Sequence, residues 1–207
     1  MISTKDYYTQ YADLYNKDDE SSFFIFKKEI SQFSAMLPAK PLILDAGCGP
    51  GKESQFFVEQ GHEVIGLDIS EGMLDKYKAN ISSAKTIQSS FTDIPLENDS
   101  VDAVFCSFAL LHLNKKDGGL ALSEFTRVLR KNGLLFLGTT IQDGNDEFYT
   151  HKKARNLDLP GIYFYHWQCD ELLETFKKLK FELMHKTLAS PLKDRPGIII
   201  YIGRKCE

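Results

Sequence analysis

The sequence predicts an α/β domain in which a doubly wound, mostly parallel sheet carries helices on both faces. From residue 41 onward, short apolar runs alternate with amphipathic stretches, which is the pattern of such a sheet. The run 101–108 is almost continuously apolar, as expected of a central strand buried on both faces. A glycine-rich segment, 45–51, joins the first predicted strand to the helix after it, and this position is a ligand site in doubly wound folds.

Each element follows from its apolar periodicity and from a local start or stop signal. Prolines end the N-terminal helical pattern, Gly61 ends the helix after the glycine-rich segment, and Ser70 is a suitable N-cap for the next helix. Asn132 and Gly133 supply a turn before the fifth strand. The predicted strands are 42–45, 64–67, 85–88, 101–108, 134–139, 181–186 and 197–203. The predicted helices are 5–16, 21–36, 52–60, 71–80, 116–130 and 170–180.

We expect a single domain, because 207 residues form one sizeable core and are short for two. Within it, 1–38 is a predicted helical cap, 41–140 the ligand-binding core, 141–168 a loop or lid, and 169–207 a helix with a strand pair. The segment 142–165 is polar and aromatic and contains a Pro-Gly step, which favours a long loop with at most one helix. The last two strands are expected to pair antiparallel.

Composition is typical of a soluble globular protein and disfavours several partners, with 43% hydrophobic and 26% charged residues. A formal net charge of −4 lacks the broad positive field that nucleic acid requires. No apolar stretch approaches the ~20 residues of a membrane span, and the N-terminus lacks the apolar core of a signal peptide. The four cysteines form no CxxC pair, so no metal site is expected. We therefore expect a cytoplasmic monomer or homodimer.

The spacing of the glycines separates the classes of nucleotide site. A dinucleotide fingerprint starting at Gly47 would need Gly or Ala at position 52, which is Lys52. A phosphate-binding loop that ends at 51–52 would need glycine at 46 and a hydroxyl at 53, where the chain has Ala46 and Glu53. Asp45 beside the loop suits a ligand with an ammonium group and a sulfonium better than it suits pyrophosphate.

A second acid follows at the same edge of the predicted sheet. Asp68 ends the second predicted strand, where a carboxylate can accept two hydrogen bonds from a ribose diol. Glycines in the loop before it permit backbone angles closed to other residues and let a ligand approach the main chain. The loop and the acid together predict a nucleoside site.

The run 42–51, Leu-Ile-Leu-Asp-Ala-Gly-Cys-Gly-Pro-Gly, resembles the first motif of class I S-adenosylmethionine-dependent methyltransferases. The resemblance continues through 8–15, 64–70, 91–96, 105–113 and 129–135, although Asn132 stands where a second glycine or proline is commoner. It implies a Rossmann-like seven-stranded sheet with the last strand inserted antiparallel. It also implies S-adenosyl-L-methionine as cofactor and in-line methyl transfer to an acceptor, which we expect to be a small molecule.

The resemblance also assigns roles to individual residues. Asp68 would bind the ribose hydroxyls, Asp93 would accept a hydrogen bond from the adenine amino group, and Met73 would pack near the adenine. His112 is the predicted catalytic residue, as a general base for acceptors that carry a proton of high pKa. The predicted cofactor-binding residues are Asp45, Gly47, Cys48, Gly49, Gly51, Asp68, Ile69, Met73, Phe91, Asp93 and Ser107.

Structural alternatives to these roles remain open. Asp68 is also placed to cap a helix, Asp93 to form an ordinary turn, and Met73 to fill the core. His112 can equally act only as a hydrogen-bonding group. An aromatic cluster before the helix 170–180 predicts either a pocket wall or a hydrophobic staple. It comprises Tyr163, Tyr165, His166 and Trp167.

Other functions also remain open. A cofactor-binding protein without catalysis is one, because methyl transfer has no obligatory catalytic side chain. A nicotinamide-dependent oxidoreductase is another, and Lys52 argues against it. The sequence Ser107-Phe-Ala-Leu after the fourth strand differs from the Asn or Asp followed by Pro-Pro and an aromatic of enzymes that methylate amino groups of nucleic-acid bases. That branch is therefore not expected.

Overall fold

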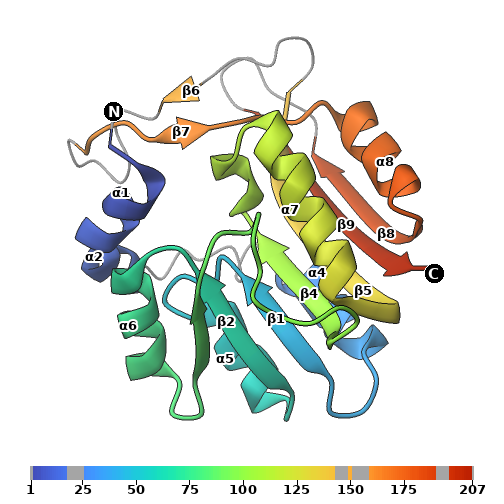
Figure 1. Ribbon diagram of the computed structural model, residues 1–207, viewed down its shortest axis with the longest axis horizontal. Coiled ribbons are helices and arrows are strands. Elements are labelled where there is room, and N and C mark those ends of the chain that lie inside the picture. Colours follow the sequence, from blue (N-terminus) through green and yellow to red (C-terminus); the bar gives the residue numbers. More distant parts are fainter. Residues whose placement is uncertain (1, 18–25, 143–148, 151–158, 190–195, 207) are drawn as a thin grey trace.

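The computed structural model describes residues 2–17, 26–142, 149–150, 159–189 and 196–206 (Figure 1). At its centre is a seven-stranded sheet of order β3-β2-β1-β4-β5-β9-β8. The strands are β1 (Leu42–Ala46), β2 (Glu63–Asp68), β3 (Lys85–Gln88), β4 (Val101–Ser107), β5 (Leu129–Ile141), β8 (Phe181–Ala189) and β9 (Gly197–Lys205). β9 lies between β5 and β8 and runs antiparallel to both. The predicted fold class is confirmed, including the inserted antiparallel strand.

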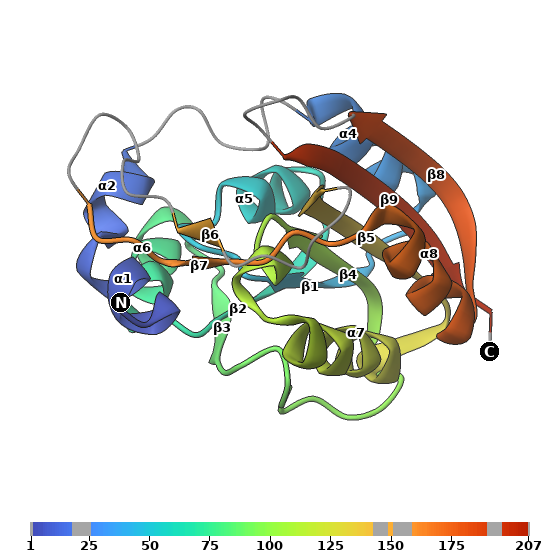
Figure 2. The ribbon, with the colours of Figure 1, turned by 90° about the horizontal axis from the view of Figure 1, so that it is seen from above.

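Helices cover both faces of the sheet, as Figure 2 shows from above. The helices are α1 (Thr4–Gln10), α2 (Ala12–Asn16), α4 (Lys27–Met36), α5 (Lys52–Glu59), α6 (Glu71–Asn80), α7 (Lys115–Val128) and α8 (Cys169–Lys178), with a short 3₁₀ turn η1 (Leu110–His112). Alternate side chains of each central strand enter different cores, because successive side chains point to opposite faces. Ile43 packs with α4 and α5, whereas Leu44 belongs to the core that contains residues of α7 and α8.

The N-terminal cap is fixed against α6 rather than against the sheet. Gly72 allows this close approach, since a Cβ there would lie 2.7 Å from the carbonyl oxygen of Thr9. The Thr9 and Ser70 hydroxyls lie 3.1 Å apart, and Lys76 pairs with Asp13 at 2.5 Å. The cap therefore sits beside the end of β2, where the next section places the site.

Several element boundaries differ from the predicted ones. The first predicted helix, 5–16, is divided at Tyr11, and the second begins at Lys27, with residues 21–25 outside the described ones. The turn at Asn132, whose φ is 64°, is a bulge within β5, because Val101 pairs with Leu129 and Ala103 with Leu134. Part of the predicted loop 142–165 forms a two-stranded pair, β6 (Tyr149–Thr150) with β7 (Tyr163–Phe164). The rest of that loop lies largely outside the described residues.

Among the residues that the structure describes, no helix is long and apolar enough to span a bilayer.

Two neighbouring glycines in α7 provide a test of the packing between this helix and Trp167. A Cβ on Gly118 would lie 2.6 Å from Cζ2 of Trp167, whereas a Cβ on Gly119 would meet nothing within 4 Å. We expect Gly119→Ala to raise the free energy of unfolding by up to ~1 kcal/mol through helix propensity. Gly118→Ala should lower it by about 1–2 kcal/mol, because the buried indole ring must shift. Urea unfolding of both variants measures this difference, and equal effects would contradict the packing described here.

Candidate functional site

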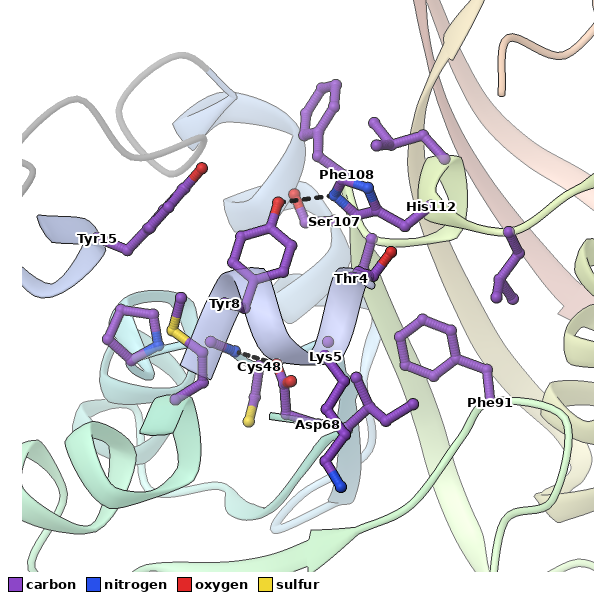
Figure 3. Close-up of a pocket in the computed structure, with 18 of the residues that line it drawn as sticks. Thr4, Lys5, Tyr8, Tyr15, Cys48, Asp68, Phe91, Ser107, Phe108 and His112 are labelled. Atoms are coloured by element: carbon purple, nitrogen blue, oxygen red, sulfur yellow. Dashed lines mark hydrogen bonds between the residues drawn. The ribbon is translucent and has the colours of Figure 1, made fainter. Parts of the chain in front are cut away.

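A cavity of about 740 Å³ opens where the carboxyl ends of β1, β2 and β4 meet the N-terminal cap (Figure 3). The sheet order reverses between β1 and β4, and ligands of doubly wound folds bind at such a switch point. From the core, the cavity is lined by Gly47, Cys48, Gly49, Pro50, Lys52, Glu53, Asp68, Ile69, Met73, Ser89, Ser90, Phe91, Ser107, Phe108, Ala109, Leu111, His112, Leu113 and Thr140. The remaining lining residues are Ser3, Thr4, Lys5, Tyr8, Tyr15, Phe26, Phe164 and Ile198.

The glycine-rich loop brings bare main chain to the cavity. Gly47 and Gly49 have φ angles of 80° and 50°, in the left-handed region that favours glycine. A Cβ on Gly47 would lie 2.3 Å from Cβ of Ala109, so this glycine is required for the loop to approach η1. A Cβ on Gly49 would meet nothing within 4 Å, so the space beside Gly49 is open to a ligand.

Asp68 is a buried carboxylate that lines the same cavity. Its Oδ2 accepts a hydrogen bond from the Gly49 amide at 3.1 Å, and its Oδ1 accepts one from the Ser70 amide at 2.9 Å. Burial raises the pKa of Asp68, and these amide hydrogen bonds oppose that rise. The N-cap of α6 is Ser70, whose hydroxyl accepts a hydrogen bond from the Met73 amide at 3.2 Å. Since each carboxylate oxygen has a second lone pair, Asp68 can still accept hydrogen bonds from a ligand.

Two of the predicted cofactor-binding residues lie behind the loop rather than on the cavity wall. Asp45 is buried, and its Oδ2 accepts a hydrogen bond from the Ser54 hydroxyl at 2.5 Å. Burial raises the pKa of Asp45 to about 8. Gly51 is the N-cap of α5, and a Cβ there would lie 2.8 Å from Ile81 and Tyr77. The geometry favours structural roles for both residues, and their predicted ligand contacts stay predictions.

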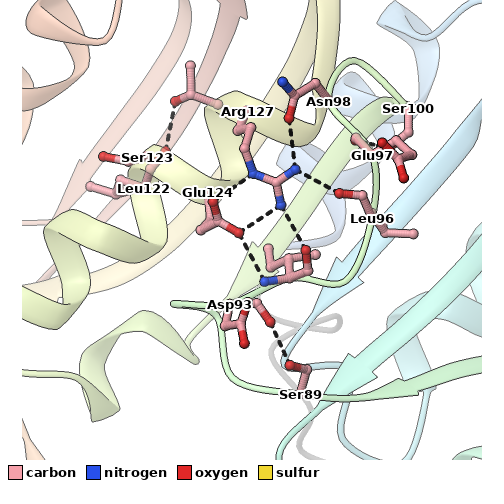
Figure 4. A network of polar contacts seen from close by, with 12 residues as sticks. Ser89, Asp93, Leu96, Glu97, Asn98, Ser100, Leu122, Ser123, Glu124 and Arg127 are labelled. Atoms are coloured by element: carbon pink, nitrogen blue, oxygen red, sulfur yellow. Dashed lines mark hydrogen bonds and ion pairs between the residues drawn. The ribbon is translucent and has the colours of Figure 1, made fainter.

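The segment after β3 contains two predicted cofactor-binding residues, and only one of them lines the cavity. Phe91 lines the cavity, whereas the Asp93 side chain is exposed and absent from the cavity lining. Arg127 in α7 positions this segment by donating to the carbonyl oxygens of Ile94 at 2.8 Å and Leu96 at 2.7 Å (Figure 4). The arginine also pairs with Glu124, which accepts from the Ile94 amide at 3.0 Å. This placement favours the turn role of Asp93 over the contact with adenine that the resemblance implies, and that contact is untested.

His112 lies at the opposite end of the cavity, on η1. Its Nε2 lies 2.7 Å from the Tyr8 hydroxyl and its Nδ1 3.0 Å from the carbonyl oxygen of Tyr163. A carbonyl oxygen only accepts, so Nδ1 carries the proton, and neutral Nε2 must accept from Tyr8. Burial lowers the pKa of His112 to about 4, which keeps the ring neutral above about pH 5. The Tyr8 hydrogen bond thus occupies the lone pair that a general base would use.

The other predicted residues divide between the cavity and the core. Cys48, Ile69, Met73 and Ser107 line the cavity, and the first and third of these are also buried. The predicted aromatic cluster is split. Tyr165 and Trp167 belong to the hydrophobic core, and the His166 Nδ1 lies 2.8 Å from the Thr140 hydroxyl, while Tyr163 contributes its carbonyl oxygen to His112.

Sequence reasoning missed several residues that complete the cavity. Tyr8, Phe26, Phe164 and Ile198 come from segments far apart in the chain, and Phe108 was assigned to a strand. Of these, Tyr8 and Phe108 lie in segments that carried the resemblance, 8–15 and 105–113, although neither was named as a site residue. The others become neighbours only through the folding of the cap and β9 over the sheet edge.

Comparison with known proteins finds similarity to methyltransferases. A family model described as "Methyltransferase domain" matches residues 44–137. A malonyl-[acyl-carrier protein] O-methyltransferase of Yersinia pestis is 38% identical over 106 residues, covering 51% of this chain and 39% of that protein. A sterol 24-C-methyltransferase of Gibberella zeae is 28% identical over 207 residues, covering 88% of this chain and 54% of that protein. The chain thus spans only about half, or less, of the length of these two relatives.

Solved structures share the fold. A S-adenosylmethionine-dependent methyltransferase from Methanosarcina mazei aligns with a TM-score of 0.73 at 17% identity, covering 83% of this chain and 95% of that one. A Burkholderia thailandensis 1,6-didemethyltoxoflavin-N1-methyltransferase, with that compound and S-adenosylhomocysteine bound, aligns with a TM-score of 0.65 at 18% identity. The second alignment covers 100% of this chain and 92% of that chain.

The position of Asp45 leads to a pH-dependent prediction. Because its pKa is raised to about 8 in the folded protein, from about 3.9 when unfolded, the folded state holds more protons between these values. This carboxyl therefore makes the protein less stable as pH rises from about 4 to about 8. Asp45→Asn keeps an oxygen for Ser54 and removes the titration. We expect the variant to gain stability relative to the wild type between pH 5 and pH 8, measured by urea unfolding. A difference that stays constant with pH would show that Asp45 is ionised and solvated.

Proposed function

We propose that the chain carries a class I S-adenosylmethionine-dependent methyltransferase domain and that the protein transfers a methyl group from S-adenosylmethionine to a small-molecule acceptor. The observation that carries the proposal is the placement of the Asp68 carboxylate on the cavity wall beside the open side of Gly49. A cytoplasmic location and a monomeric or homodimeric state are also proposed, from sequence alone.

The residues of the cavity fit S-adenosylmethionine in chemical character. Asp68 is an acceptor for ribose hydroxyls, and the uncovered main chain at Gly47 and Gly49 admits a bulky ligand. Met73 and Phe91 offer apolar surface for an adenine ring beside it. When bound, this cofactor supplies a methyl group on a positively charged sulfur, which is already activated for transfer.

The protein then acts mainly by positioning the reactants and excluding water. The cap closes the cavity over the ends of β1 and β4, with Tyr8 of α1 reaching His112 of η1 (Figure 3). Holding two reactants in line is worth ~7–11 kcal/mol in oriented intramolecular reactions. A neutral His112, hydrogen-bonded on both nitrogens, orients groups at this end of the cavity and is a weak base.

A panel of ligands tests the class of cofactor. At a hundredfold excess over the Kd, a ligand that binds only the folded state stabilises it by ~2.7 kcal/mol. We expect S-adenosylhomocysteine to raise the melting temperature clearly, and NADH and ATP to leave it unchanged, because Lys52 and Ala46 depart from both of those motifs. Stabilisation by NADH alone would favour the oxidoreductase instead. Transfer of labelled methyl groups to a metabolite extract then separates an enzyme from a binding protein without catalysis.

Substitutions of Asp68 and Asp93 provide a matched pair of variants. We expect Asp68→Ala to weaken S-adenosylhomocysteine binding by ~1.5–3 kcal/mol, or about ten- to a hundredfold, because charged hydrogen bonds are lost. Asp93→Ala should change the affinity less than about twofold, since its side chain is exposed and outside the cavity lining. Calorimetry measures both, with urea unfolding as a control for folding. An equal loss in Asp93→Ala would restore the adenine contact implied by the resemblance, and an unchanged Asp68→Ala would remove the ribose contact.

A further inference from the structure

The cavity has two chemically different ends. The charged residues of the cavity lining are Lys5, Lys52, Glu53 and Asp68. Lys52 and Glu53 begin α5 directly after the glycine-rich loop, and Figure 3 shows Lys5 on the same side as Asp68. The other end, called here the aromatic end, is lined by Tyr8, Tyr15, Phe26, Phe108, Leu111, His112, Leu113, Thr140, Phe164 and Ile198. No side chain in this second set carries a formal charge when His112 is neutral. The described residues that line this end therefore offer no countercharge to a charged acceptor, whose desolvation there is costly.

Rings form the walls of the aromatic end. Phe26 stacks on Phe108 with ring centroids 5.4 Å apart and an interplanar angle of 26°. The His112 ring lies 5.2 Å from Tyr8 and 4.8 Å from Phe164 by the same measure. Aromatic rings prefer offset-stacked and edge-to-face neighbours, so these walls suit a flat ring better than a branched chain.

The backbone of Phe108 is strained, and Phe108 is part of this wall. Its φ of 52° lies in the left-handed region, which is rare and unfavourable for a bulky residue. The surrounding structure holds the conformation, since the Phe108 amide donates to the Gly138 carbonyl oxygen at 2.8 Å. Asn or Gly would adopt this turn with less strain. A phenyl ring at this position is therefore better explained by its place in the cavity than by the turn.

The Tyr8 hydroxyl determines which hydrogen-bonding group a ligand can present at the aromatic end. Its hydroxyl proton is donated to Nε2 of His112 at 2.7 Å, as the protonated Nδ1 requires. Oη of Tyr8 can therefore act toward a bound molecule only as an acceptor. An occupant that donates an O–H to Tyr8 would be favoured over one that carries only acceptors.

We propose that the aromatic end binds a flat, uncharged acceptor with a ring hydroxyl, a phenol or an enol, which donates its hydrogen bond to Tyr8 Oη. This rests on the proposed function, because it names the acceptor of that same site. As the ring oxygen bonds to the methyl carbon, the carbon–sulfur bond breaks with its electron pair staying on sulfur. The hydroxyl proton of the acceptor moves to Tyr8 Oη as the proton of Tyr8 moves to His112 Nε2, and the protonated imidazole, the conjugate acid of a weak base, releases the proton to water.

Binding to the protein loaded with S-adenosylhomocysteine tests the acceptor class separately from the cofactor. Calorimetry first establishes the affinity for S-adenosylhomocysteine, and a failure at that step would refute the proposed function. Four probes of matched shape are then titrated: 1-naphthol, 1-methoxynaphthalene, 1-naphthoate and 1-naphthylmethylammonium. We expect 1-naphthol to bind at least about tenfold more tightly than each of the others, the worth of one hydrogen bond without a desolvated charge.

Tyr8→Phe separates the hydroxyl from the ring, and Tyr11→Phe is its matched control on the same cap, outside the cavity lining. In Tyr8→Phe, 1-naphthol should fall to the affinity of 1-methoxynaphthalene while S-adenosylhomocysteine still binds within about twofold. Tyr11→Phe should leave all affinities unchanged. Preference for the carboxylate or the ammonium probe, or binding of none of the four, would overturn the proposal. So would an advantage of 1-naphthol that persists in Tyr8→Phe.

Discussion

The site depends on the hydrogen bonds between the Asp68 carboxylate and two main-chain amides. One oxygen holds Gly49 of the glycine-rich loop and the other holds Ser70 at the start of α6, so a single side chain joins the ends of β1 and β2. Parallel strands bring these ends to one edge. Burial raises the pKa of Asp68, and the amides that it accepts from oppose this rise only in part. The loop thereby keeps its uncovered main chain toward the cavity.

The second part of the site comes from elements that are remote in sequence. The cap packs closely on α6 at Gly72, and it places the Tyr8 hydroxyl within hydrogen-bond distance of His112. The carbonyl oxygen of Tyr163 selects the tautomer of His112 and so decides which partner donates. The charged groups near the glycine-rich loop are thus separated from the aromatic rings beneath the cap, as the proposed division between cofactor and acceptor requires.

The elements that could be predicted are those whose apolar periodicity and turn residues lie close together in the sequence. The strand, loop and strand from Leu42 to Asp68 carry their periodicity and their glycines within 27 residues, and the structure reproduces them within one residue at either end. The side to which Asp45 points was also readable: it shares the face of Ile43, two residues earlier, and that face packs against α5. A carboxylate there meets Ser54 of α5 rather than a ligand beyond the strand end.

Other features had no local signal. The segment of Asp93 is positioned by Arg127, more than 30 residues later, and a left-handed Phe108 contradicts its own propensity. The first predicted helix is divided at Tyr11 into two short helices that both contact α6, and periodicity does not encode such contacts. The features that shape the aromatic end of the cavity therefore depend on tertiary contacts rather than on local sequence signals.

The most direct test is a crystal structure of the protein with S-adenosylhomocysteine bound. The account predicts ribose hydroxyl oxygens about 2.5–2.7 Å from the Asp68 carboxylate, with that carboxylate still accepting from Gly49 and Ser70. It also predicts that the thioether sulfur faces the aromatic end, toward Tyr8. A ribose bound away from Asp68, or a sulfur that faces away from Tyr8, would contradict it.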